Sequence, residues 1–536
     1  MKKTALFLAL AALPNLASPI SDDDFFKLLR ALRQVDSHTV KSAAADYDES
    51  QSQPSQEANG DYLRYADLRG TFGKSLRHFH SGFIDPSAFE SLFKAINTGK
   101  NSDFNQIQLG TGTVKLTSPQ AALSYSLTGN DAWLRAILPA PTFASAETAG
   151  EMVELYWTVL TRDTAFNAFT GNPIVTAACA NLTALSAFNG PRIGGAVTPA
   201  TYLRGSLPGC LTGPYISQFL YQDLPFGALT VPPSQRVPIA GMANDFNYTF
   251  ADWFTVANGG STGNATTYDL AESFIRNSRD LAEYVRLDTP GQAGLTACLI
   301  LASYGTQALD PNNPYFNNPT QMGFVTYGIS QILEMCRVAA HDALKAAWYH
   351  KWLFNLRLRP EEYGFYLDQQ LAGGANLGIH PDLTTSPVLP LIQANYGSYF
   401  LPVAYPEGSP SHPSYPSGHA TFTAAAVTIL KAFFNEDFII PNPVEPNLAN
   451  NALVPYAGPP LTVGGELNKL TANIGIGRDS GGVHYRSDAE QGFLLGEQIA
   501  IDILNNEAFL NNEDFAGFSL TKFDGTRITV GAKKKL

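Results

Sequence analysis

Residues 411–434, SHPSYPSGHATFTAAAVTILKAFF, join a cluster of turn-forming residues to an apolar helical pattern. Pro416 and Gly418 disfavour regular structure, whereas residues 420–434 carry Ala, Leu and aromatic side chains at helical spacing, so a helix is predicted to begin near His419. The first N–H groups of a helix lack acceptors and lie at the positive end of its dipole. The stretch therefore predicts a helix mouth that favours a tetrahedral oxyanion. A serine N-cap beside a structural histidine is the alternative, of equal weight for this stretch alone.

Composition indicates a globular, mainly helical chain. The 536 residues are 45% hydrophobic, enough for one large core or two packed ones. A formal charge of -12 argues against nucleic acid or an anionic membrane surface as a partner. No sustained alternation calls for a large sheet. Helical periodicity recurs at residues 144–163, 270–284, 293–305, 326–356, 419–434, 465–476 and 488–505. The segment 365–412 is predicted to be loop.

The N-terminus has the pattern of a secretory signal peptide. Lys2 and Lys3 precede an apolar stretch at residues 4–14, and cleavage is predicted near Ala17 or Ser18. Export predicts a secreted or periplasmic protein, and an amphipathic or partly buried N-terminal segment is the alternative. No other apolar run approaches the roughly 20 residues that span a bilayer, so no membrane partner is expected.

The four cysteines show no zinc or redox spacing. Cys179 and Cys210 lie in a Gly/Pro-rich stretch and could form a disulfide in an exported protein. Cys298 and Cys336 lie in apolar helical runs and are predicted to be buried, where they would act as small hydrophobic residues.

KWLFNLRLRP, residues 351–360, places two cations in an apolar and aromatic run. If the run is helical, Lys351 and Arg359 lie roughly 12 Å apart along the axis on nearly one face, so their long side chains could converge on one anion. Alternatively, they only complement a helix end or extend to solvent.

A third cluster lies within residues 477–500, GRDSGGVHYRSDAEQGFLLGEQIA. Residues 487–490 have the form of a capping box that starts an apolar helix, which places His484 in a loop just before it. Asp488 is predicted to hold one imidazole nitrogen of His484 and to leave the other free to bond. Taken alone, Arg478 and His484 would more often be local hydrogen-bonding groups than catalytic ones.

The three clusters together resemble the signature of the vanadium-dependent haloperoxidases and the related acid phosphatases. Their order is Lys-x7-Arg-Pro, then Pro-Ser-Gly-His, then Arg-x5-His-x3-Asp. Further stretches, among them residues 61–78 (DYLRYADLRGTFGKSLRH) and 112–131 (GTVKLTSPQAALSYSLTGND), are similar to the bromoperoxidase branch of algae and bacteria. The resemblance covers residues from about 60 to about 505.

This resemblance implies a mostly helical protein built on two four-helix bundles joined by long loops. With the signal peptide predicted at 1–18 from the N-terminal pattern, the organisation expected for the rest of the chain is an N-terminal helical region at 19–310 for packing and dimerisation and a C-terminal bundle at 311–536 with a vanadate site.

The resemblance also implies site residues. His484 would be the one protein ligand of vanadium, with Asp488 behind it, and His419 would act as acid/base at the apical oxygen. Fixed cations and helix-terminal N–H groups suit an oxyanion better than carboxylate or thiolate ligands do. The vanadate-binding set implied by the resemblance is Lys351, Arg359, Ser417, Gly418, Arg478 and His484.

The implied reaction is the oxidation of bromide or iodide by hydrogen peroxide to a hypohalous-acid equivalent that halogenates small organic acceptors. Protonation of the departing oxygen falls to His419 or Lys351. Trp348 and His412 resemble the halide side of algal-type bromoperoxidases, although His412 could equally close a turn. His350 precedes the lysine where some relatives carry another residue, so oxidation of chloride also stays open as an activity.

An acid phosphatase is the alternative, because five-coordinate vanadate has the shape of a phosphoryl-transfer transition state. His484 would then carry the phosphoryl group as a phosphohistidine, oriented by Asp488, and His419 would protonate the leaving alcohol. The long N-terminal half and the lack of membrane spans favour the haloperoxidase.

The resemblance further implies a homodimer or higher homo-oligomer formed through the N-terminal helices. Some relatives bind calcium, for which the loop at 310–321, DPNNPYFNNPTQ, offers oxygen ligands.

Overall fold

The computed structural model describes residues 22–185, 187–229, 231 and 235–531. The predicted signal peptide at 1–18 and the basic tail at 533–535 lie outside the described residues. Among the described residues, no helix is long and apolar enough to cross a membrane.

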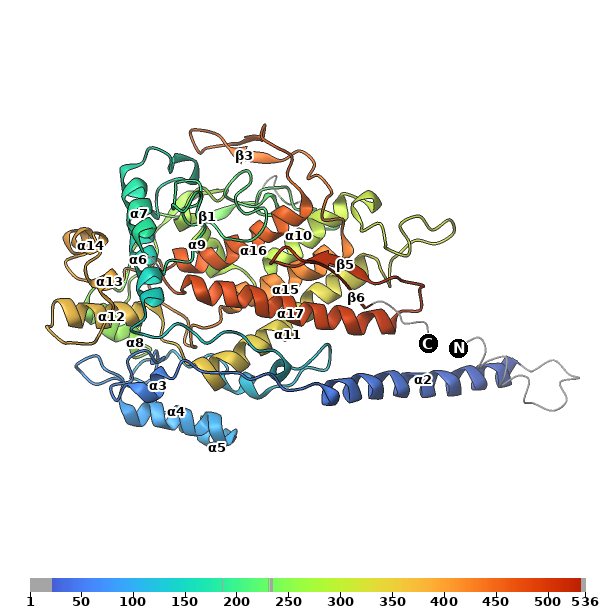
Figure 1. Cartoon of the computed structure of the whole chain (residues 1–536), viewed down its shortest axis with the longest axis horizontal. Coiled ribbons are helices and arrows are strands. Elements are labelled where there is room, and N and C mark those ends of the chain that lie inside the picture. Colours follow the sequence, from blue (N-terminus) through green and yellow to red (C-terminus); the bar gives the residue numbers. More distant parts are fainter. Residues whose placement is uncertain (1–21, 186, 230, 232–234, 532–536) are drawn as a thin grey trace, which may run out of the picture.

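The centre of the molecule is a bundle around helix α15 (Gly418–Phe433) (Figure 1). Nearly every residue of α15 is buried, as expected for a helix that is apolar all round. It packs against α10 (Gln292–Ser303), α11 (Ile329–His350), α16 (Val463–Ser480) and α17 (Arg486–Leu510), and α16 packs in turn on α9 (Ser278–Leu287). The helical-bundle prediction is confirmed.

Two glycines let α15 and α17 approach backbone to backbone. A Cβ on Gly496 of α17 would lie 2.2 Å from the Thr421 carbonyl oxygen, and one on Gly492 would lie 2.8 Å from the Ala420 Cβ. Gly492 and Gly496 are one turn apart on one face of the helix, so together they form a flat strip for α15. This close approach fixes the start of α15 against the start of α17, where the predicted site residues lie.

The N-terminal half supplies α6 (Ala146–Thr161), which is buried along most of its length. Short two-stranded antiparallel ribbons pair β1 (Val237–Ala240) with β2 (Tyr268–Ser273), β3 (Val444–Pro446) with β4 (Leu453–Pro455), and β5 (Phe518–Thr521) with β6 (Arg527–Val530). The other α-helices are α2 (Asp22–Ser50), α3 (Asp61–Arg64), α4 (Pro86–Thr98), α5 (Asn101–Phe104), α7 (Pro173–Ala184), α8 (Phe250–Ala257), α12 (Pro360–Leu371), α13 (Pro381–Thr384) and α14 (Val388–Tyr396). Single 3-10 turns lie at Pro119–Leu123, Ala132–Leu134, Phe166–Ala168, Gln218–Leu220 and Thr306–Ala308.

Two local predictions were wrong. Residues 270–273, predicted as the start of a helix, belong to strand β2, because β1 offers them backbone partners and α9 begins only at Ser278. The segment 365–412, predicted to be loop, contains most of α12 and all of α13 and α14, whose apolar faces pack on the main core.

All four cysteines are free and buried, so the disulfide considered between Cys179 and Cys210 is absent. Cys179 lies in α7, whereas Cys210 packs against α16, where its Sγ lies 3.7 Å from the Asn468 carbonyl oxygen. Cys298 and Cys336 are buried in α10 and α11, as predicted.

The main hydrophobic core runs from Ala132 to Phe523 in the sequence and therefore includes residues on both sides of position 310. A smaller core beneath α4 includes Trp352. The division of the chain at 310/311 stays a prediction.

Candidate active site

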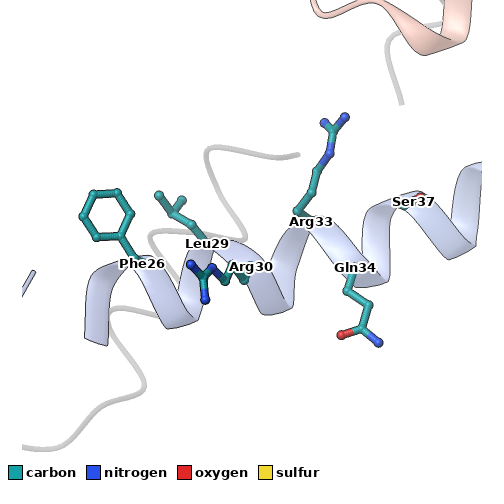
Figure 2. Close-up of a pocket in the computed structure, with 6 residues that line it drawn as sticks. All are labelled: Phe26, Leu29, Arg30, Arg33, Gln34 and Ser37. Carbon is teal, nitrogen blue, oxygen red and sulfur yellow. The ribbon is translucent and has the colours of Figure 1, made fainter. Parts of the chain in front are cut away.

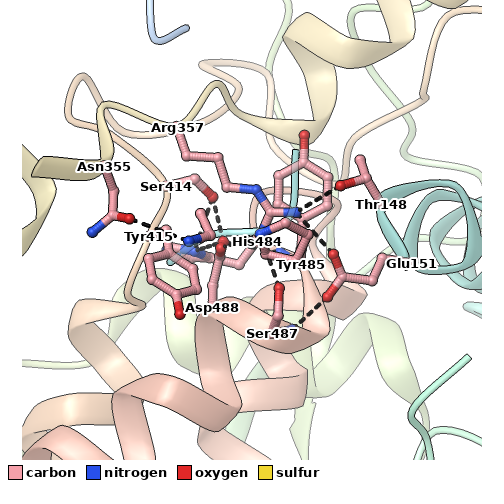
Figure 3. Close-up of polar contacts among 12 residues, drawn as sticks. Thr148, Glu151, Asn355, Arg357, Ser414, Tyr415, His484, Tyr485, Ser487 and Asp488 are labelled. Carbon is pink, nitrogen blue, oxygen red and sulfur yellow. Dashed lines mark hydrogen bonds and ion pairs between the residues drawn. The ribbon is translucent and has the colours of Figure 1, made fainter. Parts of the chain in front are cut away.

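The three polar clusters of the sequence meet near the N-terminal ends of α15 and α17, where Arg359 contacts both His412 and His484. Figure 3 shows His484 and Asp488 beside Ser414 and Arg357. Lys351 and Arg359 do not lie on one helix, so that prediction was wrong. After α11 the chain makes a π-helical turn, Lys351–Asn355, and Leu356 then adopts a left-handed conformation with φ of 42°. Arg359 becomes the N-cap of α12. The chain is therefore redirected between the two cations.

The two cations nevertheless both reach the segment before α15, and their convergence on one anion stays a prediction. Lys351 Nζ donates to the carbonyl oxygens of Pro413 (2.7 Å) and Ser414 (2.8 Å). Arg359 Nε donates to the carbonyl oxygen of His412 (2.9 Å). Both side chains are completely buried, so these carbonyls anchor charges that water cannot reach.

Arg478, near the end of α16, supplies a third buried cation. Its Nη1 donates to the Val285 carbonyl oxygen (2.8 Å), and its Nε is buried without a partner among the described residues. Burial and the neighbouring guanidinium of Arg478 lower the pKa of Arg359 to about 9. Burial, Arg359 and Arg478 also lower the pKa of Lys351 well below its ordinary value. The pocket thus concentrates positive charge that an anion would stabilise.

The hydrogen bonds of His484 define its tautomer. Arg359 Nη1 lies 2.9 Å from His484 Nε2, and because a guanidinium can only donate, Nε2 must accept with its lone pair. Nδ1 therefore carries the proton and donates to Asp488 Oδ2 (2.8 Å). Burial, Arg359, Lys351 and Arg478 lower the pKa of His484 well below its usual value, so the ring is neutral. A neutral imidazole whose Nε2 carries no proton is what a metal centre requires.

Asp488, which accepts from His484 Nδ1, is also held by other groups. Its Oδ2 also accepts from the Tyr485 N–H (3.1 Å) and from the Ser414 hydroxyl, and its Oδ1 pairs with Arg357 Nη1 (2.8 Å). The proposed capping box of Ser487 and Glu490 was wrong, because Asp488 itself caps α17 from the third helical position, over the Tyr485 N-cap.

His419 contacts Asp288, a residue that the sequence did not point to. His419 Nε2 lies 2.9 Å from Asp288 Oδ1, so Nε2 carries the proton and Nδ1 is left for proton exchange. Asp288 follows α9 as its C-cap, 131 residues before His419 in the chain. It lies in no motif with His419, so no local signal could have found it.

Ser417 and Gly418 form the predicted helix mouth, since Ser417 is the N-cap of α15 and Gly418 its first residue. Trp348 covers this mouth: a Cβ on Gly418 would lie 3.2 Å from the Trp348 ring. The Trp348 ring centroid lies 4.7 Å from that of His412, and Arg359 Nη2 lies 3.0 Å from His412 Nδ1. Trp348 and His412 therefore lie together at the edge of the cationic pocket.

These residues fit a tetrahedral or five-coordinate oxyanion. Lys351, Arg359 and Arg478 form no ion pair with any carboxylate of the described residues, which leaves their charge for a ligand. Backbone N–H groups at a helix start add donors of the kind that oxyanions select. A single neutral imidazole nitrogen, in place of a cluster of carboxylates or thiolates, suits a metal that arrives already bound to oxygen.

Comparison with known proteins agrees with this geometry. The family model of the VCPO second helical-bundle domain matches residues 331–512, which include the site residues described above except Asp288. The chain is 35% identical over 491 residues to a vanadium-dependent bromoperoxidase of Ascophyllum nodosum, covering 87% of each chain. It is 33% identical over 568 residues to one of Corallina pilulifera, covering 88% of this chain and 94% of the relative.

A solved structure shows the same architecture. The second vanadate-dependent bromoperoxidase of Ascophyllum nodosum, a homohexamer, superposes with a TM-score of 0.87 at 27% identity and covers 97% of this chain and 95% of its own. The chain belongs to the vanadium-dependent haloperoxidase family, and the two relatives and the solved structure described above are bromoperoxidases.

Proposed function

We propose that the protein is a vanadium-dependent bromoperoxidase that oxidises bromide or iodide with hydrogen peroxide and passes the oxidised halogen to small organic acceptors. The observation that carries the proposal is the His484 Nε2 lone pair, aimed among three buried cations that form no ion pair with a carboxylate. Full-length similarity to bromoperoxidases supports the same activity.

Vanadate would be held by His484 through Nε2 and by the side chains of Lys351, Arg359 and Arg478, with Ser417 and the Gly418 N–H at the helix mouth. When bound, it supplies a Lewis-acidic centre that polarises the peroxide O–O bond. The buried cations neutralise the charge on the oxyanion without competing carboxylates. The helix start adds backbone donors that need no reorganisation during turnover.

His419 would move the proton. Asp288 holds Nε2–H, so the Nδ1 nitrogen can accept a proton from peroxide and return it to the departing oxygen. Lys351 is the second candidate donor, because burial among cations makes its ammonium more acidic. Trp348 and His412 would form the halide side, where the aromatic ring excludes water and Arg359 attracts the anion.

The direct test is bromination of a dye by purified protein, with peroxide and bromide, before and after addition of orthovanadate to the apoprotein. We expect turnover only with vanadate. The same pocket could instead form a phosphohistidine on His484, so hydrolysis of a phosphomonoester is measured in parallel. Phosphatase turnover that far exceeds bromination at every vanadate concentration would favour the phosphatase.

We also propose a homo-oligomer assembled through α2. This helix extends away from the body of the molecule (Figure 1), and Phe26 and Val35 on it are 57% and 64% exposed. A pocket lies along the same helix, and Figure 2 shows the residues that line it: Phe26, Leu29, Arg30, Arg33, Gln34 and Ser37. Large apolar side chains exposed along an otherwise polar helix favour a second copy as their cover.

Light scattering on the full chain and on a variant with Phe26→Asp and Leu29→Asp tests this assembly. A lower mass is expected for the variant, and an unchanged mass contradicts the proposed assembly.

Calcium binding by the loop 310–321 and export from the cell stay predictions.

A further inference from the structure

Behind His484 lies a chain of buried charges that begins on α6, in the N-terminal half. We propose that Glu151 and Arg357 are positioning residues that hold Asp488, and through it His484, in the orientation that aims Nε2 into the anion pocket. The inference rests on the proposed vanadate site and adds to it two residues that touch neither the anion nor the halide side.

The first link joins α6 to the loop after α11. Glu151 Oε2 accepts from Arg357 Nη2 (2.9 Å), and Glu151 Oε1 accepts from the Ser487 N–H (2.6 Å). Arg357 Nη1 donates to Asp488 Oδ1 (2.8 Å) and to the Ser487 hydroxyl (2.9 Å). One carboxylate therefore fixes both the arginine and the first turn of α17 (Figure 3).

The second link fixes the carboxylate that His484 touches. The two oxygens of Asp488 are divided: Oδ1 faces Arg357, and Oδ2 accepts from His484 Nδ1 (2.8 Å). Without Arg357, rotation of the Asp488 carboxylate would be restrained on the Oδ2 side only. Since Nδ1 and Nε2 belong to one rigid ring, the position of Oδ2 determines where Nε2 points.

The shape of the guanidinium matters as well as its charge. Arg357 lies with its guanidinium carbon 3.8 Å from the centre of the Tyr485 ring, and its two terminal nitrogens face Glu151 and Asp488 on opposite sides. A lysine ammonium is one point and cannot reproduce this planar bridge. All these side chains are buried, so the contacts are not exchanged with water.

The chain contains a matched control one turn along α6. Glu154 pairs with Arg486 through two hydrogen bonds, of 2.9 Å from Nε and 2.5 Å from Nη2. This pair is as deeply buried as Glu151 and Arg357. Arg486 Nη1 donates its further hydrogen bond to the Arg204 carbonyl oxygen (3.1 Å), and not to Asp488. Loss of either glutamate removes one buried ion pair of α6. Only Glu151 is connected to His484, through Arg357 and Asp488.

The experiment compares Glu151→Gln and Glu154→Gln in the full-length apoprotein. Equilibrium dialysis against orthovanadate, with vanadium measured by elemental analysis, gives the affinity without turnover. We expect the Kd for vanadate to rise roughly 10- to 100-fold in Glu151→Gln, as is typical when a group behind a metal-binding histidine is lost. The Kd of Glu154→Gln should stay within about threefold of the unaltered protein, at a comparable loss of thermal stability.

Dialysis against inorganic phosphate separates positioning from general damage. Phosphate matches vanadate in charge and shape, but it needs the cations and the helix mouth more than the His484 lone pair. In Glu151→Gln we expect phosphate affinity to change much less than vanadate affinity. Arg357→Lys keeps the charge and should still lose vanadate affinity, because the two-sided bridge is gone. If Glu151→Gln does not fold, Ser487→Ala removes a single acceptor of Arg357 and should show a smaller loss, again selective for vanadate.

Equal losses in the Glu151 and Glu154 variants, or equal weakening of vanadate and phosphate in Glu151→Gln, would overturn the inference and leave the pair a purely structural role. Full vanadate affinity in Arg357→Lys would overturn the requirement for a planar bridge. If the unaltered protein binds no vanadate, the proposed function itself fails, and the positioning role fails with it.

Discussion

His419 and Asp288 are separated by 131 residues in the chain, and their side chains meet with Nε2 and Oδ1 2.9 Å apart. Asp288 is buried at the end of α9, whereas the side chain of His419 is a quarter exposed. A carboxylate held at this position both orients the imidazole and stabilises its protonated form. We therefore expect this contact to control the proton transfer proposed for His419.

Replacement of Asp288 by Asn should shift the pH dependence of bromination. Burial and the Arg478 guanidinium lower the pKa of His419, and Asp288 opposes them. Without the carboxylate the pKa falls further, so less His419 is protonated at a given pH, and the basic limb of the rate profile moves to lower pH. We expect kcat to fall roughly 10- to 100-fold near neutral pH, with vanadium content unchanged. An unshifted basic limb would show that Asp288 does not act through His419.

Replacing each of the two site histidines by Ala should separate binding from chemistry. His484→Ala removes the Nε2 lone pair and is expected to lose vanadium and bromination together. His419→Ala keeps the three cations and the helix start, so it should retain vanadium while losing at least tenfold in turnover. Vanadium content by elemental analysis and bromination rates decide the matter. Retained vanadium in His484→Ala would disprove its assignment as ligand.

Phosphate should compete with vanadate for Lys351, Arg359 and Arg478. Apoprotein stored in millimolar phosphate is expected to regain bromination slowly or not at all when vanadate is added, because the two anions share charge and tetrahedral shape. The same apoprotein should hydrolyse a phosphomonoester slowly, and vanadate should abolish that activity. The rate of reconstitution as a function of phosphate concentration tests the shared pocket. A rate of reconstitution that does not change with a millimolar excess of phosphate would contradict a shared pocket.

Gly418→Ala should alter the halide side more than vanadate retention. The new Cβ would lie 3.2 Å from the Trp348 ring and 3.4 Å from Leu344, so the indole must give way slightly and its packing on His412 changes. Strain of about 1 kcal/mol corresponds to roughly a fivefold change in the KM for bromide. Steady-state kinetics at varied bromide, with vanadium content as control, provides the measurement. Loss of vanadium with an unchanged KM would place the effect at the helix mouth instead.

Buried His78 and His350 predict sensitivity to acid. Burial lowers the pKa of each to about 4, below the value of about 6.5 expected in the unfolded chain. The unfolded state thus binds more protons between pH 6.5 and 4. The free energy of unfolding is therefore undiminished by these histidines above pH 6.5, and it decreases as the pH drops towards 4. Each histidine accounts for a loss of at most about 3 kcal/mol. Denaturant unfolding of His350→Leu should show a flatter pH dependence, and an unchanged slope would refute the assignment.

Much of the helical framework could be predicted from local pattern. The predicted run at 144–163 is α6 at Ala146–Thr161, and the run at 488–505 lies within α17 at Arg486–Leu510. Periodicity failed where a partner overrode it: residues 270–273 joined β1 in a ribbon, and Asp488 replaced Ser487 as the capping side chain of α17. In both places, a hydrogen-bond partner decided between conformations that the local pattern left close in free energy.

The sequence by itself determined which residues are candidates for the site, because the spacing of cations, glycine and histidine around predicted helix ends is a local property of the chain, and the family resemblance implied their roles. Lys351, Arg359, His419 and His484 were all candidates on that ground. Only the tertiary structure decided which groups stand behind them. Asp288 reaches His419, and Glu151 reaches Arg357, through packing of α9 and α6 against the bundle. Such contacts depend on how distant helices pack in the core, and no periodicity along the chain encodes the distance between two side chains that meet only after folding.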